Sequence, residues 1–441
     1  MSFTKLPAEL QIQVFSYLSN RDLKSVRAVN IRCRDNASVW LFRSIIACAR
    51  YQAMGVFQKI SLHPVYQNYV KEIVFDATEY ERVLAENEKA YHRLADRHKE
   101  LKNVVSWHRH TKFKKYQLLY KEQEEIKQGV LVQTIAKALE WMPHIHSIVY
   151  CALPRHIPVE KKDMQEILPR GIVDRRIMPQ GDTSESLENG FHHLIGAIAM
   201  ARYNKIREFR VERYPASTWP LPISPFQFEH FLFSHPTYLE SGKYFFHNLT
   251  SVDLAFTYQH GAAIAQEILV NMHVLLREIK DLRRIRIHMP RSATRFANPN
   301  TIDTLTDPHS FATFGLNTQW EHLQCVDLQG LYASEQQLKK LVAWGKHTLE
   351  SIKFSFCILS TGKWSNMVEE IVYGTSIKEF VLDHVNESYV GDVLFRELPE
   401  LDAAPWSYEG QVELDDKGER FFHERAGKSV YAWRNLLTEL D

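Results

Sequence analysis

The chain has few cysteines, and no pattern joins them. Five are scattered over 441 residues, and no Cys-x-x-Cys pair occurs among them: Cys33, Cys48, Cys151, Cys325 and Cys357. The odd number and wide spacing favour neither a disulfide framework nor a zinc motif. We expect small buried thiols in an intracellular protein of the cytoplasm or nucleus, with Cys357 also a candidate for a repeat position.

The sequence also lacks signals for membranes or nucleic acid. No stretch approaches the ~18 consecutive apolar residues of a membrane span, and residues 1–7 lack the basic and apolar character of a signal peptide. The 54 Lys and Arg residues are balanced by 53 Asp and Glu residues, giving a net charge of +1. We expect no membrane and no nucleic acid among the partners.

Catalytic and phosphate-binding motifs are absent as well. The sequence contains no Gly-x-Gly-x-x-Gly, P-loop, Gly-x-Ser-x-Gly or His-Glu-x-x-His. Among 21 histidines, the close pairs lack a partnering Cys or carboxylate at a recognisable spacing: His108/His110, His144/His146 and His192/His193. We expect no catalytic residue, no cofactor and no metal, and interpret these histidines as surface or packing residues.

What the chain does have is the composition of a globular protein with several parts, at 45% hydrophobic and 24% charged residues. We predict a mixed α+β or α/β protein. Residues 1–50 are expected to form a small all-α cluster, and 51–130 a helical linker region with long charged amphipathic helices. Residues 131–400 are expected to form an α/β recognition domain, and 401–441 a tail with a hairpin and a helix.

Helix signals crowd the first 50 residues. Pro7 suits a first helical turn, and the spacing of Ser19 and Asp22 predicts a capping box at the start of a second helix. Apolar residues of the first helix recur at Leu10, Val14, Tyr17 and Leu18, and those of the second at Leu23, Val26 and Val29. A third helical segment is expected through Trp40, Leu41, Ile45 and Ile46.

Residues 79–127 contain no Gly or Pro and predict one or two long amphipathic helices. Their apolar positions are Tyr80, Val83, Leu84, Tyr91, Leu94, Leu101 and Val105. The basic run from His108 to Lys115 is either a binding site for something acidic or a solvated helix face. The second interpretation is favoured because acidic residues follow at once.

An apolar triad of the form φ-x-x-φ-x-φ recurs along the chain and predicts short strands with one buried face. The triads are Val70/Ile73/Phe75, Ile145/Ile148/Tyr150, Ile206/Phe209/Val211, Leu249/Val252/Leu254, Leu282/Ile285/Ile287, Leu323/Val326/Leu328, Leu349/Ile352/Phe354 and Ile377/Phe380/Leu382. Helix-like segments precede several of them, at 191–203, 264–279 and 335–344. This order favours an irregular leucine-rich-repeat-like α/β solenoid, with a non-repeating α/β domain as the alternative.

Three segments are expected to be long loops, at 154–190, 213–248 and 291–319. The second holds a cluster of aromatics that either lines a recognition pocket or, as we favour, buries an insertion: Phe226, Phe228, Phe231, Phe233, Tyr238, Tyr244, Phe245 and Phe246. The tail predicts a hairpin around 415–418 and a final helix through Trp433 and Leu437.

The residues Leu6-Pro7-Ala8-Glu9-Leu10, Asp22-Leu23 and Trp40-Leu41-Phe42 together resemble an F-box, which here covers about 45 residues. The match departs from the family at Cys33, where Trp or Phe is usual. The chain also resembles fungal F-box proteins, through Tyr69–Tyr80, Glu122–Glu125 and Ala138–Pro143.

The resemblance implies that the amino-terminal motif binds a Skp-family adaptor and, through it, a cullin–RING ligase. The residues it assigns to the adaptor-facing surface are Leu6, Pro7, Leu10, Val14, Leu18 and Leu23. We expect the chain to be the substrate-recognition subunit of a Skp–cullin–F-box ubiquitin ligase, not an enzyme, with an unknown protein substrate. The alternatives are an F-box protein that engages the adaptor without cullin, and an enzyme with an active site after residue 131.

Overall fold

The computed structural model describes ten stretches of the chain. They are residues 6–97, 106–151, 167–171, 190–212, 226–256, 264–289, 309–375, 377–387, 408–414 and 420–424. The chain divides into two compact units, one of Met1–Phe226 with Phe233–Phe245 and the other of Gln227–Leu232 with Phe246–Asp441. This boundary falls inside the 131–400 range; the domain division drawn from the sequence remains a prediction.

The first unit begins with three short helices, α1 (Ala8–Phe15), α2 (Asn20–Arg27) and α3 (Ile31–Leu41). They are followed at once by strand β1 (Ser44–Cys48), so the expectation of a helix through Ile45 and Ile46 was wrong. Two adjacent β-branched residues fit a pleated strand well, and β1 pairs in parallel with β2.

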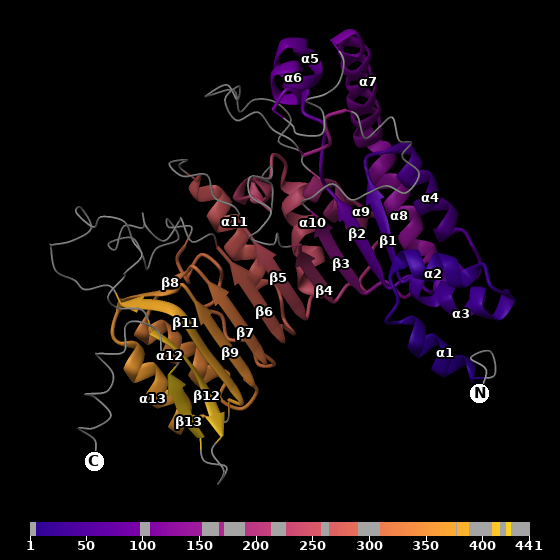
Figure 1. The fold of residues 1–441 in the computed structure, drawn as a ribbon. Helices are drawn as coiled ribbons and strands as arrows, with labels where there is room; N and C mark the ends of the chain where they lie inside the picture. The colour runs from indigo at the N-terminus through magenta and orange to yellow at the C-terminus, as the bar shows by residue number, and fades with distance from the viewer. Residues whose placement is uncertain are drawn as a thin grey trace. The chain divides into compact units, whose positions relative to one another are not determined.

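Four parallel strands follow one another across the sheet of the first unit in chain order: β1, β2 (Glu72–Asp76), β3 (Ser147–Cys151) and β4 (Glu208–Val211) (Figure 1). Helices α4 (Tyr51–Ser61), α8 (Leu131–Trp141) and α9 (Gly190–Met200) lie in the same unit. Aromatic side chains join the sheet to α9, because Tyr150 lies 6.3 Å from Phe191 and 5.9 Å from Phe75 between ring centroids.

A helical arm is inserted between β2 and β3. Its described residues form α5 (Arg82–Glu86), α6 (Glu88–Ala95) and α7 (Ser106–Glu125), where one or two long helices were expected. A π-helical turn, η3 (Ile126–Val130), joins α7 to α8, and Gly129 accommodates its φ of 144°. Leu101 and Val105 of the predicted apolar face lie outside the described residues.

The second unit repeats the pattern with five parallel strands in chain order: β5 (Ser251–Ala255), β6 (Arg284–His288), β7 (Cys325–Gln329), β9 (Ser351–Ser355) and β11 (Glu379–Glu387) (Figure 1). Helix α11 (Gln266–Arg277) lies between β5 and β6 in the chain, α12 (Glu335–Trp344) between β7 and β9, and α13 (Trp364–Gly374) between β9 and β11. Two short strands, β8 (Tyr332–Ser334) and β10 (Ile358–Thr361), pair with each other beyond the ends of β7 and β9.

The triads are confirmed as the buried positions of these strands. Each of the eight overlaps a parallel strand, and every triad side chain is at most 3% exposed. The register aligns them in rows, so that Val252, Ile285, Val326, Ile352 and Phe380 are successive partners. A single apolar face therefore runs across the strands of each sheet.

In three strands of the second unit, the residue after the same register position has a left-handed backbone conformation, with positive φ. Gly330, Phe356 and His384 have φ values of 71°, 52° and 52°. They come directly after Gln329, Ser355 and Asp383, which are neighbours in the register. Only glycine adopts this conformation without strain, so its recurrence at two other residue types indicates a bend that the repeating geometry imposes.

The segment 213–248, expected as a loop, is partly helical. Residues 213–225 lie outside the described part, but η6 (Phe228–Phe231) and α10 (Pro236–His247) follow. Six of its phenylalanines are buried, which supports the packing interpretation of the aromatic cluster: Phe226, Phe228, Phe231, Phe233, Phe245 and Phe246. The expected loops at 154–190 and 291–319 fall largely outside the described residues.

The predicted tail hairpin is present as β12 (Tyr408–Leu414) and β13 (Arg420–Glu424), an antiparallel pair. The final helix through Trp433 and Leu437 lies outside the described residues. In the part of the chain that the structure describes, no helix combines the length and apolar character needed to cross a membrane.

Candidate docking site on the amino-terminal helices

The first helix presents its two sides to different surroundings. It starts after Pro7, whose carbonyl accepts a 3.1 Å hydrogen bond from the Gln11 amide. Gln11 and Phe15, four positions apart, are buried. Leu10 and Val14, on the neighbouring stripe, are 47% and 44% exposed. The apolar residues of α1 therefore divide between a core and a surface.

Side-chain caps fix where the next two helices begin. The hydroxyl oxygen of Ser19 accepts a hydrogen bond from the Asp22 amide at 3.2 Å, so Ser19 caps α2 as one half of the predicted capping box; the Asp22 carboxylate accepts from the Ser19 hydroxyl at 2.6 Å instead of from the Ser19 amide. The Asn30 carboxamide oxygen accepts one from the Cys33 amide at 2.8 Å and starts α3. Such caps stabilise a helix by about 1 kcal/mol each, so the turns between these short helices are well defined.

The core of the three-helix cluster is small. Its fully buried members are Phe15, Leu23, Cys33 and Ala37, and Leu18, Val26, Trp40 and Leu41 pack around them. Cys33, the departure from the F-box pattern, is 4% exposed and serves as a small apolar side chain in this core. The thiol thus occupies an interior position instead of altering the outer surface.

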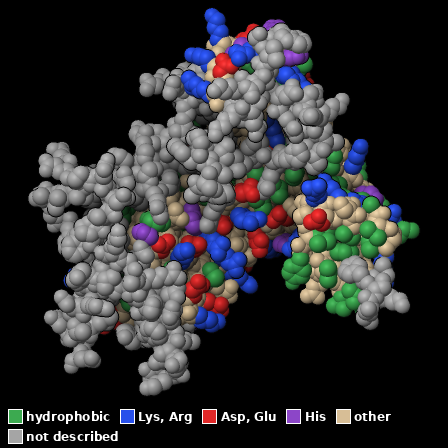
Figure 2. Space-filling model, viewed as in Figure 1, with side chains coloured by type: hydrophobic (Ala, Val, Ile, Leu, Met, Phe, Trp, Pro, Cys, Tyr) green, Lys and Arg blue, Asp and Glu red, His purple; other side chains and the backbone are tan. Residues whose placement is uncertain are grey.

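The outer surface of the cluster is unusually apolar. Five large side chains expose between 44% and 83% of their area: Leu10, Val14, Tyr17, Val29 and Ile31. Figure 2 shows hydrophobic side chains gathered over α1–α3. Exposed apolar side chains gathered in one region of a folded protein are typical of an interaction site.

The six residues that the F-box resemblance assigns to the adaptor-facing surface differ in their exposure to solvent. Pro7, Leu10 and Val14 are exposed, whereas Leu6 and Leu18 are partly buried. Leu23 is only 2% exposed, so it supports the surface from beneath and does not present itself to a partner.

Tyr17, Val29 and Ile31 also belong to this surface but were not assigned to it from the sequence. The sequence periodicity predicts Tyr17 and Val29 on the apolar faces of the first and second helices, but Tyr17 lies after the end of α1 and Val29 after the end of α2. Ile31 is the first residue of α3. One sequence signal could have identified these three residues. Each is a large apolar residue beside a helix end, where the cap leaves its side chain outside the packed face of the helix.

Contacts with the following segment tie this cluster to the sheet. The Arg27 guanidinium lies 4.9 Å from the Phe42 ring centroid and donates a hydrogen bond to the Tyr66 hydroxyl at 3.2 Å. The rings of Phe42 and Tyr66 stack at 4.1 Å. Tyr66 lies in η2 (Tyr66–Asn68), just before β2, so the cluster is anchored within the first unit.

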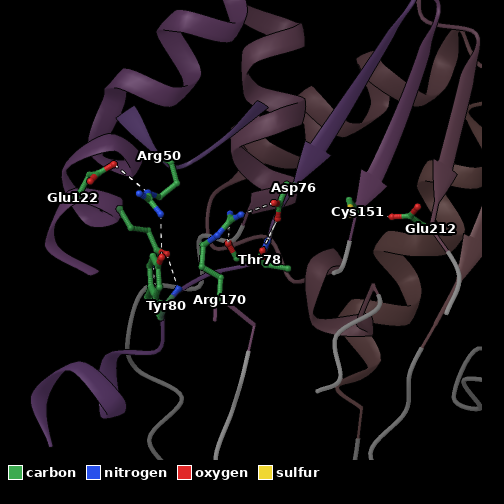
Figure 3. Close-up of polar contacts among 9 residues, drawn as sticks. Arg50, Asp76, Thr78, Tyr80, Glu122, Cys151, Arg170 and Glu212 are labelled. Atoms are coloured by element: carbon green, nitrogen blue, oxygen red, sulfur yellow. Dashed lines mark hydrogen bonds and ion pairs between the residues drawn. The ribbon is translucent and has the colours of Figure 1, made fainter. Parts of the chain in front are cut away.

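A second group of polar side chains lies at the carboxyl end of β1 and β2 (Figure 3). Arg170 donates to the Asp76 carboxylate at 2.8 Å, and both side chains are at most 4% exposed. The same carboxylate accepts hydrogen bonds from the amide and the hydroxyl of Thr78. Because its acceptors are filled from within the protein, this group acts as a structural tie for residues 167–171.

The Cys48 thiol, near this tie, is a poor nucleophile. Burial raises the pKa of Cys48 to about 12, despite the nearby Arg170. A thiol held protonated neither attacks a carbonyl nor binds a metal readily. Cys151, at the end of β3, donates a hydrogen bond from its thiol to the Glu212 carboxylate at 2.9 Å (Figure 3).

The base of the arm holds another polar network. The Glu122 carboxylate accepts hydrogen bonds from the Tyr51 amide at 2.7 Å and from Arg50 Nε at 3.2 Å (Figure 3). Arg50 also donates to the Tyr80 hydroxyl at 3.0 Å. A carboxylate at the first turn of α4 is favourable because the helix amino terminus carries partial positive charge, so α7 is fixed to α4.

Among the described residues, no group of three or more His, Cys, Asp or Glu side chains converges as a metal site would require. His192 and His193 are buried packing residues, at 0% and 5% exposure, and His110 pairs with Glu88 at 2.8 Å on the arm.

Comparison with known proteins adds no family to this description. No protein-family model matches the chain, and no curated protein is significantly similar to it in sequence. Any functional assignment therefore depends on the residues and geometry described above.

Proposed function

We propose that the chain is the substrate-recognition subunit of a Skp–cullin–F-box ubiquitin ligase, attached to the adaptor through α1–α3. The observation that supports this proposal most directly is the exposed apolar surface of the cluster, formed by Leu10, Val14, Tyr17, Val29 and Ile31. A cluster with a core this small gains free energy by covering such side chains with a partner. The resemblance of Leu6-Pro7 and Asp22-Leu23 to an F-box indicates the class of partner, a Skp-family adaptor.

We further propose that the alternating strands and helices form an irregular leucine-rich-repeat-like solenoid. Three features support it: strands that pair in chain order, aligned apolar triads, and the bend repeated at Gly330, Phe356 and His384. Cys357 lies just after one bend, and its thiol contacts the Leu328 carbonyl at 3.4 Å. Buried hydrogen-bonding residues at this point are what such repeats require.

In this proposal, the sheet face opposite the triads selects the target protein. Its side chains in the second unit are mainly polar or charged. Arg286 lies between Asp253 at 3.8 Å and Asp327 at 3.6 Å, and the exposed Lys353 is the next partner of Asp327 in the register. Repeat proteins commonly bind partners on such an extended face.

The test is co-purification with a Skp-family adaptor. Leu10→Ser combined with Val14→Ser removes two exposed apolar contacts, and the expected result is at least a tenfold loss of bound adaptor, since interface anchors contribute about 1–2 kcal/mol each on truncation. The matched control is Leu62→Ser with Met200→Ser, two residues 56% and 60% exposed outside the cluster.

Full retention of the adaptor by the Leu10/Val14 double variant, with folding verified by circular dichroism, rejects the docking assignment. Adaptor that co-purifies without cullin supports the alternative, a scaffold protein outside the ligase.

A further inference from the structure

The outer face of α7 combines positive charge with one exposed leucine. His110, Lys114, Leu118 and Lys121 are spaced by four, four and three residues and so lie on one stripe of the helix. Leu118 is 66% exposed, and Lys114 and Lys121 on either side are exposed too. The opposite stripe is buried, with Phe113, Tyr116 and Leu119 in the core of the arm.

The arm is basic up to the last turn of α7, in a chain that is nearly neutral. Its described residues, 82–97 and 106–125, contain nine Lys or Arg residues and six Asp or Glu residues, and three of these six lie in that last turn at Glu122, Glu124 and Glu125. Figure 2 shows Lys and Arg side chains over the arm, at the top of the view.

Internal partners take up part of this charge. Arg82 pairs with Glu86 and Arg109 with Asp96. For Lys114 and Lys121, no ion pair with another described residue occurs.

Three acidic residues follow the stripe in the last turn of α7, and each has a partner at the base of the arm. Glu122 binds Arg50 and the Tyr51 amide, Glu124 lies 3.4 Å from Lys127, and the Glu125 carboxylate accepts a hydrogen bond from the Tyr51 hydroxyl at 3.4 Å. Positive charge is therefore concentrated on the part of α7 that precedes Glu122, where it is available to a partner.

The arm is held firmly enough to act as a docking element. The Gln123 carboxamide makes hydrogen bonds to both the amide and the carbonyl of Tyr80, at 2.7 and 3.2 Å. The Tyr116 hydroxyl accepts one from the Glu81 amide at 2.8 Å, and the Gln117 side chain donates to the Ala85 carbonyl at 2.7 Å. These contacts fix the rotation of α7, so the same stripe always faces outward.

We propose that this stripe docks an acidic segment of a protein partner, with an apolar side chain of that segment packed on Leu118. The carboxylates complement Lys114 and Lys121, while the leucine offers an apolar contact between them. A nucleic acid fits less well, because its phosphates offer nothing apolar to cover Leu118. Among its described side chains, the stripe also has no Phe, Tyr or Trp on which a base would stack. This inference is independent of adaptor binding by α1–α3.

The test uses the full chain and a fluorescein-labelled helical peptide rich in Glu with leucines at every fourth position, followed by fluorescence anisotropy. Lys114→Glu with Lys121→Glu is expected to weaken binding roughly tenfold or more, and Leu118→Ser roughly fivefold. The matched control, Lys340→Glu with Lys346→Glu, makes the same charge change at exposed positions of the second unit and is expected to leave affinity unchanged.

Two comparison probes are a leucine-free Glu peptide and a DNA duplex of equal length. The expected order is Leu-containing peptide tightest, with both comparison probes weaker. The proposal is overturned if the Leu-containing peptide does not bind, if the duplex binds as tightly, or if Leu118→Ser has no effect on a protein shown to be folded by its melting curve.

Discussion

Trp40 on α3 donates a hydrogen bond from its indole Nε1 to the carbonyl oxygen of Ile12 on α1, at 2.7 Å. The bond joins the last turn of the third helix to the middle of the first. It lies behind the exposed residues Leu10 and Val14, which belong to the same helix as Ile12. The packing of Trp40 therefore sets the position of the proposed docking surface.

Replacing this indole tests that role. Trp40→Phe keeps an aromatic ring but removes the donor, and is expected to lower the free energy of unfolding by about 1 kcal/mol. The control is Trp141→Phe at the end of α8, which is 55% exposed and is expected to change stability by less than about 0.5 kcal/mol. Urea denaturation followed by circular dichroism measures both, and equal effects contradict the role given to Trp40.

The buried pair of Arg170 and Asp76 gives a second prediction. Arg170→Met leaves a buried carboxylate without its cation and is expected to lower the free energy of unfolding by about 3–5 kcal/mol. Adding Asp76→Asn to this variant is expected to recover part of the loss, because the uncompensated charge disappears. A double-mutant cycle from urea denaturation measures the coupling; additive effects of the two changes contradict a direct pair.

Glu81 gives a prediction on pH. Burial, and next the neighbouring Glu79 carboxylate, raise the pKa of Glu81 from 4.5 to about 7 in the folded chain. A raised pKa in the folded state means that the folded form binds its proton more tightly. The stability that this group contributes is thus complete below about pH 4.5 and is lost as pH rises through about 7.

Glu81→Gln removes this dependence, since the amide resembles the protonated acid. The variant is expected to be more stable than the parent by about 1–3 kcal/mol near pH 8, and nearly equal to it near pH 5. Glu86→Gln at the end of α5, the helix that begins just after Glu81, is the control; its side chain is 59% exposed, and it is expected to show no such trend. The test is the melting temperature of the parent and of Glu81→Gln, measured from about pH 5 to pH 8. If the two melting temperatures change with pH in parallel, the prediction is refuted.

Two glycines give opposite predictions for the same substitution. At Gly330 a Cβ would lie 2.9 Å from the Met289 carbonyl oxygen, and φ is 71°. Gly330→Ala is therefore expected to destabilise the chain by about 1–3 kcal/mol. At Gly55, inside α4, a Cβ would meet nothing within 4 Å, so Gly55→Ala is expected to stabilise it by about 0.5–1 kcal/mol. Thermal unfolding of both variants shows whether each substitution raises or lowers stability. If Gly330→Ala stabilises the chain, the interpretation of an imposed bend at this position is wrong.

The strands were predictable because their signal is local and repeated. A triad such as Leu349/Ile352/Phe354 buries three side chains at the start and on one face of a short strand, and the same spacing recurs eight times. The strand β1 was missed because two of its three buried residues, Ala47 and Cys48, have small side chains. An alanine carries too weak an apolar signal to distinguish a strand from the end of the preceding helix.

The candidate site was only partly predictable. Helix periodicity identified Leu10 and Leu23 alike, but the sequence does not state which of them faces a core. Tertiary packing decides this, and it buries Leu23 while leaving Leu10 exposed. Arg170 shows the same limit, since its partner Asp76 is 94 residues away in the chain, and no spacing rule connects them.

The chain-order pairing of the strands has a consequence for synthesis on the ribosome. Each of β2, β3 and β4 adds to the strand made just before it, so the sheet of the first unit grows in the direction of translation. The three-helix cluster precedes it, and every hydrogen bond described between its helices joins residues within 6–42. The apolar surface of α1–α3 thus emerges before the sheet of the first unit, which gives early association with a partner or chaperone an advantage.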